Sequence, residues 1–127
     1  MKLKEIIEVF FDSLELKAAI WTADLKQRAY NRRYFVLPDH NHKLLVFDKN
    51  DIARLKKPIK KAVYVNGKKL VKKLYIMNPK ATHMDIMREC FYYTPVKLND
   101  AASKLSSEEK EKRAKEWNKY KKAVRKR

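Results

Sequence analysis

The sequence has few of the residues that several common protein classes require. Its 127 residues include one glycine and one cysteine, and no uncharged hydrophobic run approaches the roughly 18 residues of a membrane-spanning helix. One glycine leaves no Gly-rich loop for binding phosphates. One cysteine, Cys90, excludes an internal disulfide framework and fits a reducing compartment. Nucleotide-binding loops, disulfide scaffolds and membrane spans are therefore not expected.

A secretory signal is not expected either. The apolar N-terminal stretch contains Glu5, Glu8 and Asp12, and the hydrophobic region of a signal peptide does not tolerate acids. We expect a cytoplasmic protein, or a component of a virion or another nucleoprotein assembly, and not a secreted protein.

Acidic residues are also scarce. The chain has 15 Asp and Glu against 32 Lys and Arg, a formal net charge of +17. Two blocks hold the excess: residues 26–80 carry sixteen basic and three acidic side chains, and residues 104–127 carry eleven and four. Such a field attracts polyanions. Nucleic acid, DNA or RNA, is the expected partner, and an acidic protein or a larger assembly is the alternative.

The N-terminal segment predicts an amphipathic helix over residues 3–19. Its apolar side chains recur at three- and four-residue steps, which is typical of a stripe that faces the core. The stripe consists of Leu3, Ile6, Ile7, Phe10, Phe11, Leu14 and Ala18. As an alternative, the two neighbouring phenylalanines form an oligomer contact.

The segment DHNH, residues 39–42, allows two interpretations. A zinc site built from His40, His42, His83 and Cys90 has suitable donors, but their spacing matches no closed structural site. A nuclease of the His-metal class needs a further ligand on the next helix, which has no histidine. The flanking segments 34–37 and 44–47 are β-branched and aromatic, so we interpret DHNH as the tip of a hairpin.

A second hairpin is predicted around Asn66-Gly67, the strongest two-residue hairpin signal in the chain. The following segment 66–76 also fits a helix with a basic face, because Leu70 and Leu74 recur among lysines. We favour the hairpin because the valine-rich approach agrees with the turn.

Capping signals place the remaining helices. Asp48 or Asn50 begins a short helix, and Thr82 with Asp85 begins a helix that we expect to extend over residues 82–93. Together these elements predict a single α+β domain of residues 1–103. In it, one small antiparallel sheet of two hairpins is packed by the N-terminal helix and the helix near 82–93.

The C-terminal segment predicts a long basic helix. Ser106 and Glu109 form a capping signal, and acid-first pairs at i, i+4 follow. Only a narrow apolar seam runs along this helix. We therefore expect residues 104–127 to project from the domain and to dock a partner through Trp117, Tyr120 and Val124.

The basic residues that we expect to bind nucleic acid lie in both positive blocks. Lysine is a point charge without bidentate geometry, so lysine clusters favour phosphate contacts that do not read bases. Upstream arginines alternate with Tyr30 and Tyr34, a mixture that suits backbone contact with base stacking. The set is Arg28, Arg32, Arg33, Arg54, Lys56, Lys57, Lys60, Lys61, Lys68, Lys69, Lys72, Lys73, Lys119, Lys121, Lys122, Arg125, Lys126 and Arg127.

Catalysis is not expected. On a helix, His83 lies about two turns, roughly 10 Å, from Cys90 and is a poor activating base for it. No metal, cofactor or small-molecule substrate is indicated. The sequence favours a non-enzymatic nucleic-acid-associated protein that binds the phosphate backbone with low sequence specificity. The alternative is a structural or assembly component of a ribonucleoprotein or phage virion that docks through its basic C-terminal helix.

Overall fold

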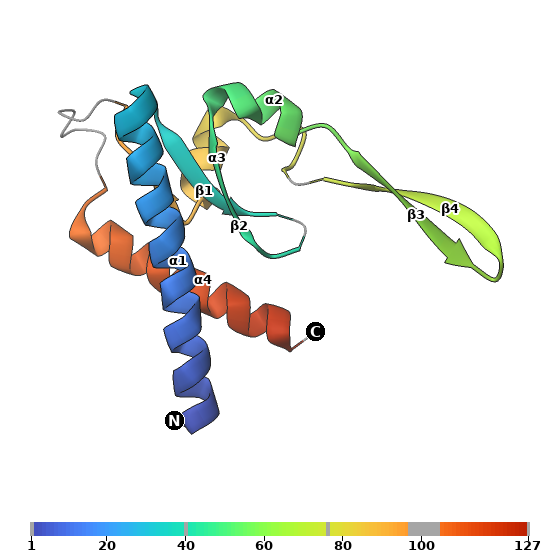
Figure 1. Ribbon diagram of the computed structural model, residues 1–127, viewed down its shortest axis with the longest axis horizontal. Coiled ribbons are helices and arrows are strands. Elements are labelled where there is room, and N and C mark those ends of the chain that lie inside the picture. Colours follow the sequence, from blue (N-terminus) through green and yellow to red (C-terminus); the bar gives the residue numbers. More distant parts are fainter. Residues whose placement is uncertain (1, 40, 76, 97–104, 127) are drawn as a thin grey trace.

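The fold is α+β, as the sequence predicts. A computed structural model of the chain describes residues 2–39, 41–75, 77–96 and 105–126, and within them lie four α-helices and two antiparallel sheets. The expected single sheet is corrected: one hairpin belongs to a three-stranded sheet of order β2-β1-β5, and the other forms a sheet of its own. This second hairpin extends far from the body of the molecule (Figure 1).

The first helix, α1, spans Leu3–Tyr30 and is longer than predicted. No proline or glycine interrupts it. It ends where Asn31 adopts a left-handed conformation, φ 53°, and donates its N–H to the carbonyl of Gln27 at 2.8 Å. Among the described residues neither α1 nor any other helix is long and apolar enough to cross a membrane.

The side of α1 that faces the body is not the side that we expected. Members of the predicted core stripe such as Leu3 and Phe10 are more than half exposed. The buried side consists of Asp12, Leu16, Ala19, Ala23 and Gln27. Because Ala19 and Ala23 are small, the helix approaches the sheet closely and packs on Val36. Small side chains thus decide the orientation of α1, although the larger ones lie opposite.

The hairpin around DHNH is confirmed. Strands β1 (Tyr34–Pro38) and β2 (Leu44–Asp48) pair antiparallel. At the tip, the Oδ1 of Asp39 accepts a hydrogen bond from the N–H of Asn41 at 2.8 Å. Among the described residues of the tip, His42 adopts a left-handed conformation, with φ 64°.

The short helix after β2 is also confirmed. Asp48 accepts a hydrogen bond from the N–H of Asp51 and caps the 3-10 helix η1 (Lys49–Asp51), which continues into α2 (Ile52–Leu55). This cap fixes the direction in which the chain leaves β2 toward the second hairpin.

Helix α3 (His83–Glu89) begins as predicted and ends earlier. Thr82 and Asp85 form the capping box, with side-chain to backbone hydrogen bonds of 3.0 and 3.2 Å. The expected continuation to residue 93 is corrected, because the next residues form strand β5 (Tyr92–Tyr93), which pairs antiparallel with β1. Aromatic residues suit a strand better than a helix end.

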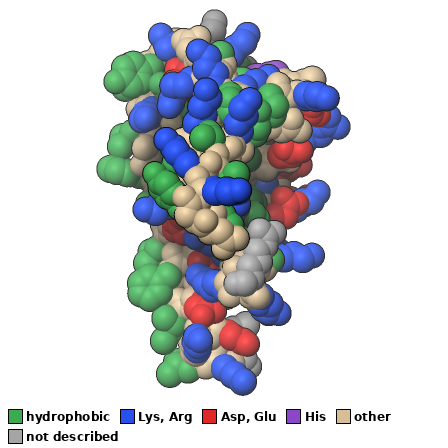
Figure 2. Space-filling view, turned by 90° about the vertical axis from the view of Figure 1, so that its right-hand side faces the viewer, with side chains coloured by type: hydrophobic (Ala, Val, Ile, Leu, Met, Phe, Trp, Pro, Cys, Tyr) green, Lys and Arg blue, Asp and Glu red, His purple; other side chains and the backbone are tan. Residues whose placement is uncertain are grey.

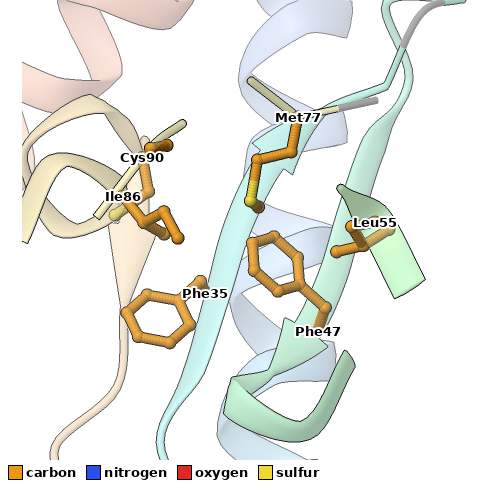
Figure 3. Packing of buried hydrophobic residues seen from close by; sticks show 7 residues of the cluster. Phe35, Phe47, Leu55, Met77, Ile86 and Cys90 are labelled. Atoms are coloured by element: carbon orange, nitrogen blue, oxygen red, sulfur yellow. The ribbon is translucent and has the colours of Figure 1, made fainter. Parts of the chain in front are cut away.

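The three-stranded sheet is covered on both faces, by α1 on one and by α2 and α3 on the other (Figure 1). Phe35 and Phe47 stack with ring centroids 5.7 Å apart. Figure 3 shows these rings between Ile86 of α3 and Leu55 of α2. The alternation of side chains along each strand thus supplies two apolar layers from one sheet.

The last helix, α4 (Ser107–Arg125), does not project from the domain as we expected. Trp117 is 0% exposed. Its indole N–H donates to the carbonyl of Asp12 at 3.0 Å, and its ring lies 5.0 Å from that of Phe91. Tyr120 stacks on Trp117 at 5.6 Å. The seam that we assigned to a partner, Trp117, Tyr120 and Val124, is therefore turned toward the protein's own body.

The second hairpin, which we call the arm, comprises β3 (Ile59–Val65) and β4 (Lys68–Leu74). Asn66 and Gly67 both have positive φ, 53° and 77°, as a type I′ turn requires. The prediction of a hairpin over a helix is confirmed. Lysines occur on both faces of the arm, so neither face is apolar enough to pack on the body.

The packing of α4 gives the first testable outcome. We expect Trp117→Ala to lower the free energy of unfolding by about 3–5 kcal/mol, because it empties a fully buried site between two helices. Urea unfolding curves measure this. Tyr30→Ala, which removes an exposed ring of α1, serves as the control and should change stability by less than about 0.5 kcal/mol. Equal effects would contradict the docking of α4.

Candidate nucleic-acid interface

The arm carries six lysines on its two seven-residue strands. Its antiparallel register sets Lys60 opposite Lys73 and Lys61 opposite Lys72. Because side chains alternate between faces along a strand, each face of the arm carries one of these pairs. Directly opposed side chains have Cβ atoms about 4.5–5.5 Å apart, so two ammonium groups lie side by side on each face.

The arm lysines have no counter-charge in the described part of the chain. All six, Lys60, Lys61, Lys68, Lys69, Lys72 and Lys73, are exposed, and none forms an ion pair with a described carboxylate. The sequence explains this, because no Asp or Glu occurs between Asp51 and Asp85. The arm is thus a ribbon of uncompensated positive charge.

This arrangement costs stability. Like charges directly opposite one another destabilise a strand pair, by roughly the 0.2–1 kcal/mol that an opposite-charge pair contributes. An isolated two-stranded hairpin is only marginally stable in water. The arm has only its turn and a few apolar cross-strand pairs, Ala62–Val71 and Val63–Leu70 among them, to oppose the repulsion. An anion between the lysines would remove that repulsion.

A second row of lysines runs along the outer side of α4. The members are exposed and recur at alternating three- and four-residue steps: Lys112, Lys115, Lys119, Lys122 and Lys126. At about 3.6 residues per turn they share one face of the helix, opposite the buried Trp117. Docking of Trp117 on α1 therefore turns the row of lysines to solvent. Figure 2 views the molecule from the side of the arm and shows Lys and Arg side chains gathered in its upper part.

A third cationic feature is a cleft of about 450 Å³ lined in part by Arg32, Arg33, Lys49 and His83. The guanidinium of Arg33 lies over the ring of Tyr93, 5.3 Å from its centroid, and its Nε is buried without a hydrogen-bond partner in the described structure. Burial lowers the pKa of His83, and the charges of Arg33 and Lys49 lower it further. At neutral pH the arginines and Lys49 therefore supply the charge of this cleft.

Several predicted contact residues instead serve the fold, because they pair with described carboxylates. The pairs are Arg32–Asp48 at 3.2 Å, Arg54–Asp51 at 3.7 Å, Lys121–Glu15 at 3.4 Å and Arg125–Asp12 at 2.5 Å. Hydrogen bonding to buried Asp12 raises the pKa of Arg125. The arm lysines and the outer row of α4 are therefore better placed for an external anion than these four residues.

The other predicted contact residues differ in their surroundings. Arg28 and Lys57 are exposed, and Lys56 is half-buried where α2 leads into the arm. Arg127 lies outside the described residues. Sequence reasoning missed Lys112, although its spacing from Lys119 would have revealed the row on a helical projection.

The aromatic residues divide between core and surface. Tyr34 and Phe35 are buried, so stacking on bases is not open to them, while Tyr30 at the end of α1 is exposed. Tyr64 near the tip of the arm is 71% exposed and lies opposite Lys69. Sequence reasoning missed Tyr64, which combines an aromatic face with neighbouring positive charge, the combination that binds single-stranded bases.

The DHNH segment and Cys90 have structural surroundings. The Nδ1 of His42 and the hydroxyl of Tyr120 share a hydrogen bond of 2.8 Å, so the hairpin tip contacts α4. His40 lies outside the described residues. Within the described ranges no three His, Cys, Asp or Glu residues are placed to hold a metal ion. Cys90 is fully buried, and burial raises the pKa of its thiol to about 11.

Comparison with known proteins adds no relative: no family model, curated protein or solved structure matches this chain. The geometry of the arm, α4 and the cleft is therefore the basis for a functional proposal.

The repulsion within the arm can be measured. Lys72→Glu places an acid opposite Lys61, so we expect slower hydrogen exchange of the arm amides, with a gain of up to about 1 kcal/mol in local stability. Lys68→Glu is the matched control, because Lys68 faces Val65. Equal protection in the two variants would show that opposed lysines do not strain the arm.

The Cys90 thiol gives a pH-dependent test. Its pKa is raised from 9.0 to about 11 in the fold, so the unfolded chain loses this proton first as pH rises. We therefore expect the free energy of unfolding to fall between about pH 9 and pH 11. Cys90→Ala removes this contribution and should make the fall shallower. A smaller fall should remain, because the raised pKa values of Tyr34 and Tyr92 lower stability in the same direction in both proteins. Identical pH profiles of stability in the unaltered protein and in Cys90→Ala would show that the thiol of Cys90 does not titrate with a raised pKa.

Proposed function

We propose that the protein is a non-enzymatic nucleic-acid-associated protein whose arm binds the phosphate backbone with low sequence specificity. One observation carries the proposal: the lysine pairs Lys60–Lys73 and Lys61–Lys72 are solvent-exposed, opposed to like charges and unmatched by any described carboxylate. Such an arrangement is unfavourable in the free protein and becomes favourable when phosphates lie between the lysines.

The dimensions of the arm support a duplex as ligand. Each strand has seven residues, which corresponds to a ribbon roughly 23 Å long. The major groove of B-form DNA, about 12 Å wide, admits a two-stranded β-ribbon. The major groove of A-form RNA is deep and narrow. We therefore expect the arm to prefer duplex DNA to duplex RNA.

The preponderance of lysine supports low sequence specificity. Bidentate recognition of base edges is mostly the work of Arg, Asn and Gln, and the arm contains none of these between its strand ends apart from the turn residue Asn66. Lysine ammonium groups hold phosphates as point charges. Binding should therefore depend steeply on salt and little on sequence.

The row of lysines on α4 offers a second contact of the same kind. Figure 1 shows the arm and the C-terminal end of α4 extending toward the same side of the molecule. A polyanion long enough to reach both would release counterions at each. The alternative function, assembly through the seam of α4, is not favoured because Trp117 is fully buried within the chain itself.

Binding measurements at several salt concentrations test the proposal. We expect retention of a random-sequence DNA duplex at about 10⁻⁶ M protein in low salt, with a slope of log K against log salt near −0.9 per phosphate contact. Replacing Lys60, Lys61, Lys72 and Lys73 together by Gln should make the slope shallower by about 3 to 4, uniformly across sequences.

The control variant carries four Lys→Gln changes at exposed positions outside the arm: Lys2, Lys4, Lys17 and Lys110. It has the same net charge as the arm variant and should keep most of the binding. An equal loss of binding in the two variants would show that binding depends on the net charge of the protein and not on the lysines of the arm. Absence of binding by the unaltered protein in low salt would refute the proposal.

A further inference from the structure

The outer side of α1 is an uncovered apolar surface, which we call the outer stripe. Its large side chains are between 42% and 73% exposed: Leu3, Ile6, Ile7, Phe10, Phe11, Leu14, Trp21 and Leu25. It lies opposite the buried side of the helix that carries Leu16 and Ala23. In Figure 2 hydrophobic side chains follow one edge of the molecule along its length.

The outer stripe is large enough for a stable protein–protein interface. At roughly 200 Å² each, its three aromatic residues alone leave on the order of 350 Å² of apolar surface in water. With the five aliphatic residues the total approaches the roughly 800 Å² that each partner of a standard interface contributes. Monomeric proteins rarely expose a contiguous apolar patch of this size.

The spacing of the outer stripe is symmetric about Leu14. Its central line consists of positions 3, 7, 10, 14, 18, 21 and 25. When two copies of α1 lie antiparallel with Leu14 facing Leu14, the other positions pair within the same line. The pairs are Leu3 with Leu25, Ile7 with Trp21, and Phe10 with Ala18.

Side-chain size favours this antiparallel arrangement over a parallel one. Antiparallel pairing sets the large ring of Phe10 against the small, exposed Ala18, so the helices can stay close. A parallel pair in register would oppose Phe10 to Phe10 and Trp21 to Trp21, which forces the helices apart at these layers. Antiparallel helices also bring opposite ends of their dipoles together.

Charge does not prevent this contact. The chain has a net charge of +17, but residues 1–25 carry three Lys against five Asp and Glu. The basic excess lies elsewhere, and repulsion between two copies acts over distances that salt screens, with a Debye length of about 8 Å at physiological ionic strength. Association through the outer stripe should therefore strengthen with salt.

We propose that the outer stripe of α1 is a homodimer interface, in which a second copy of this chain packs antiparallel with Leu14 on the two-fold axis. A closed, isologous contact of this kind uses the same patch on both subunits. The dimer carries two arms and two rows of α4 lysines. This inference does not depend on which polyanion, if any, the arms bind.

The full-length protein tests the proposal by sedimentation equilibrium. We expect a mass of twice 15.2 kDa at micromolar concentration, with the dimer favoured by added salt. Leu14→Glu should give the monomer mass at the same concentration, because it places two carboxylates on the axis at an exposed position that the fold does not need. Leu70→Glu is the control with equal charge, on a similarly exposed leucine of the arm, and should remain dimeric.

Cysteine cross-linking tests the orientation. In antiparallel pairing, Leu3→Cys protein mixed with Leu25→Cys protein should form a mixed disulfide when an oxidant such as oxidised glutathione is added, and Leu3→Cys alone should not cross-link under the same conditions. Cys90 is buried, so it should take no part in cross-linking as long as the protein is folded. A disulfide in Leu3→Cys alone would refute the antiparallel arrangement.

Other outcomes would overturn the homodimer itself. Monomeric unaltered protein at tens of micromolar, dimerisation that survives Leu14→Glu, or loss of the dimer in Leu70→Glu would each exclude the outer stripe as the interface. Monomeric protein that binds vesicles of zwitterionic lipid, with binding lost in Leu14→Glu, would assign the stripe to a membrane surface.

Discussion

The buried contact between α1 and α4 is the constraint on which the arrangement of surfaces depends. Asp12 is 3% exposed and its carboxylate is bound by Arg125, while its carbonyl accepts the indole N–H of Trp117. A buried carboxylate is costly unless a cation and hydrogen bonds compensate it. Once Arg125 and Trp117 satisfy Asp12, the rotation of both helices about their axes is fixed. The outer stripe of α1 and the lysine row of α4 lie on the opposite sides of these helices and therefore face solvent.

This constraint explains why reasoning from hydrophobicity placed the wrong side of α1 in the core. The helix has two apolar sides, and a periodic pattern alone favours the one with larger side chains. Ala19 and Ala23 allow close approach to the sheet. Asp12 can be buried on the same side of the helix because its carboxylate pairs with Arg125. The first effect depends on the sheet and the second on α4, which follows some 80 residues later, so no pattern within α1 contains that information.

Sequence signals were reliable for turns and helix caps, whose conformation depends on residues close together in the chain. The turn at Asn66-Gly67, the capping box at Thr82 and the hairpin around DHNH were all predicted from short-range backbone preferences. The short strand β5 was not, because Tyr92 becomes part of a sheet only through pairing with β1 far upstream. The same division holds for the site: composition located the arm lysines, whereas exposure and ion pairing separated them from Lys121 and Arg125.

The two surfaces left uncovered by the fold are opposite in chemistry and should respond to salt in opposite ways. Counterion release makes polyanion binding by the arm weaker as salt rises, while screening of like-charged copies makes apolar association of α1 stronger. If both occur in one molecule, a dimer would present two arms to one polyanion, and the second arm would bind at the high effective concentration set by the first. Neutralisation of the arms by phosphates would in turn remove part of the repulsion between copies. Polyanion binding and dimerisation are therefore expected to reinforce each other, because phosphates lower the repulsion between copies and the dimer supplies a second arm at high effective concentration.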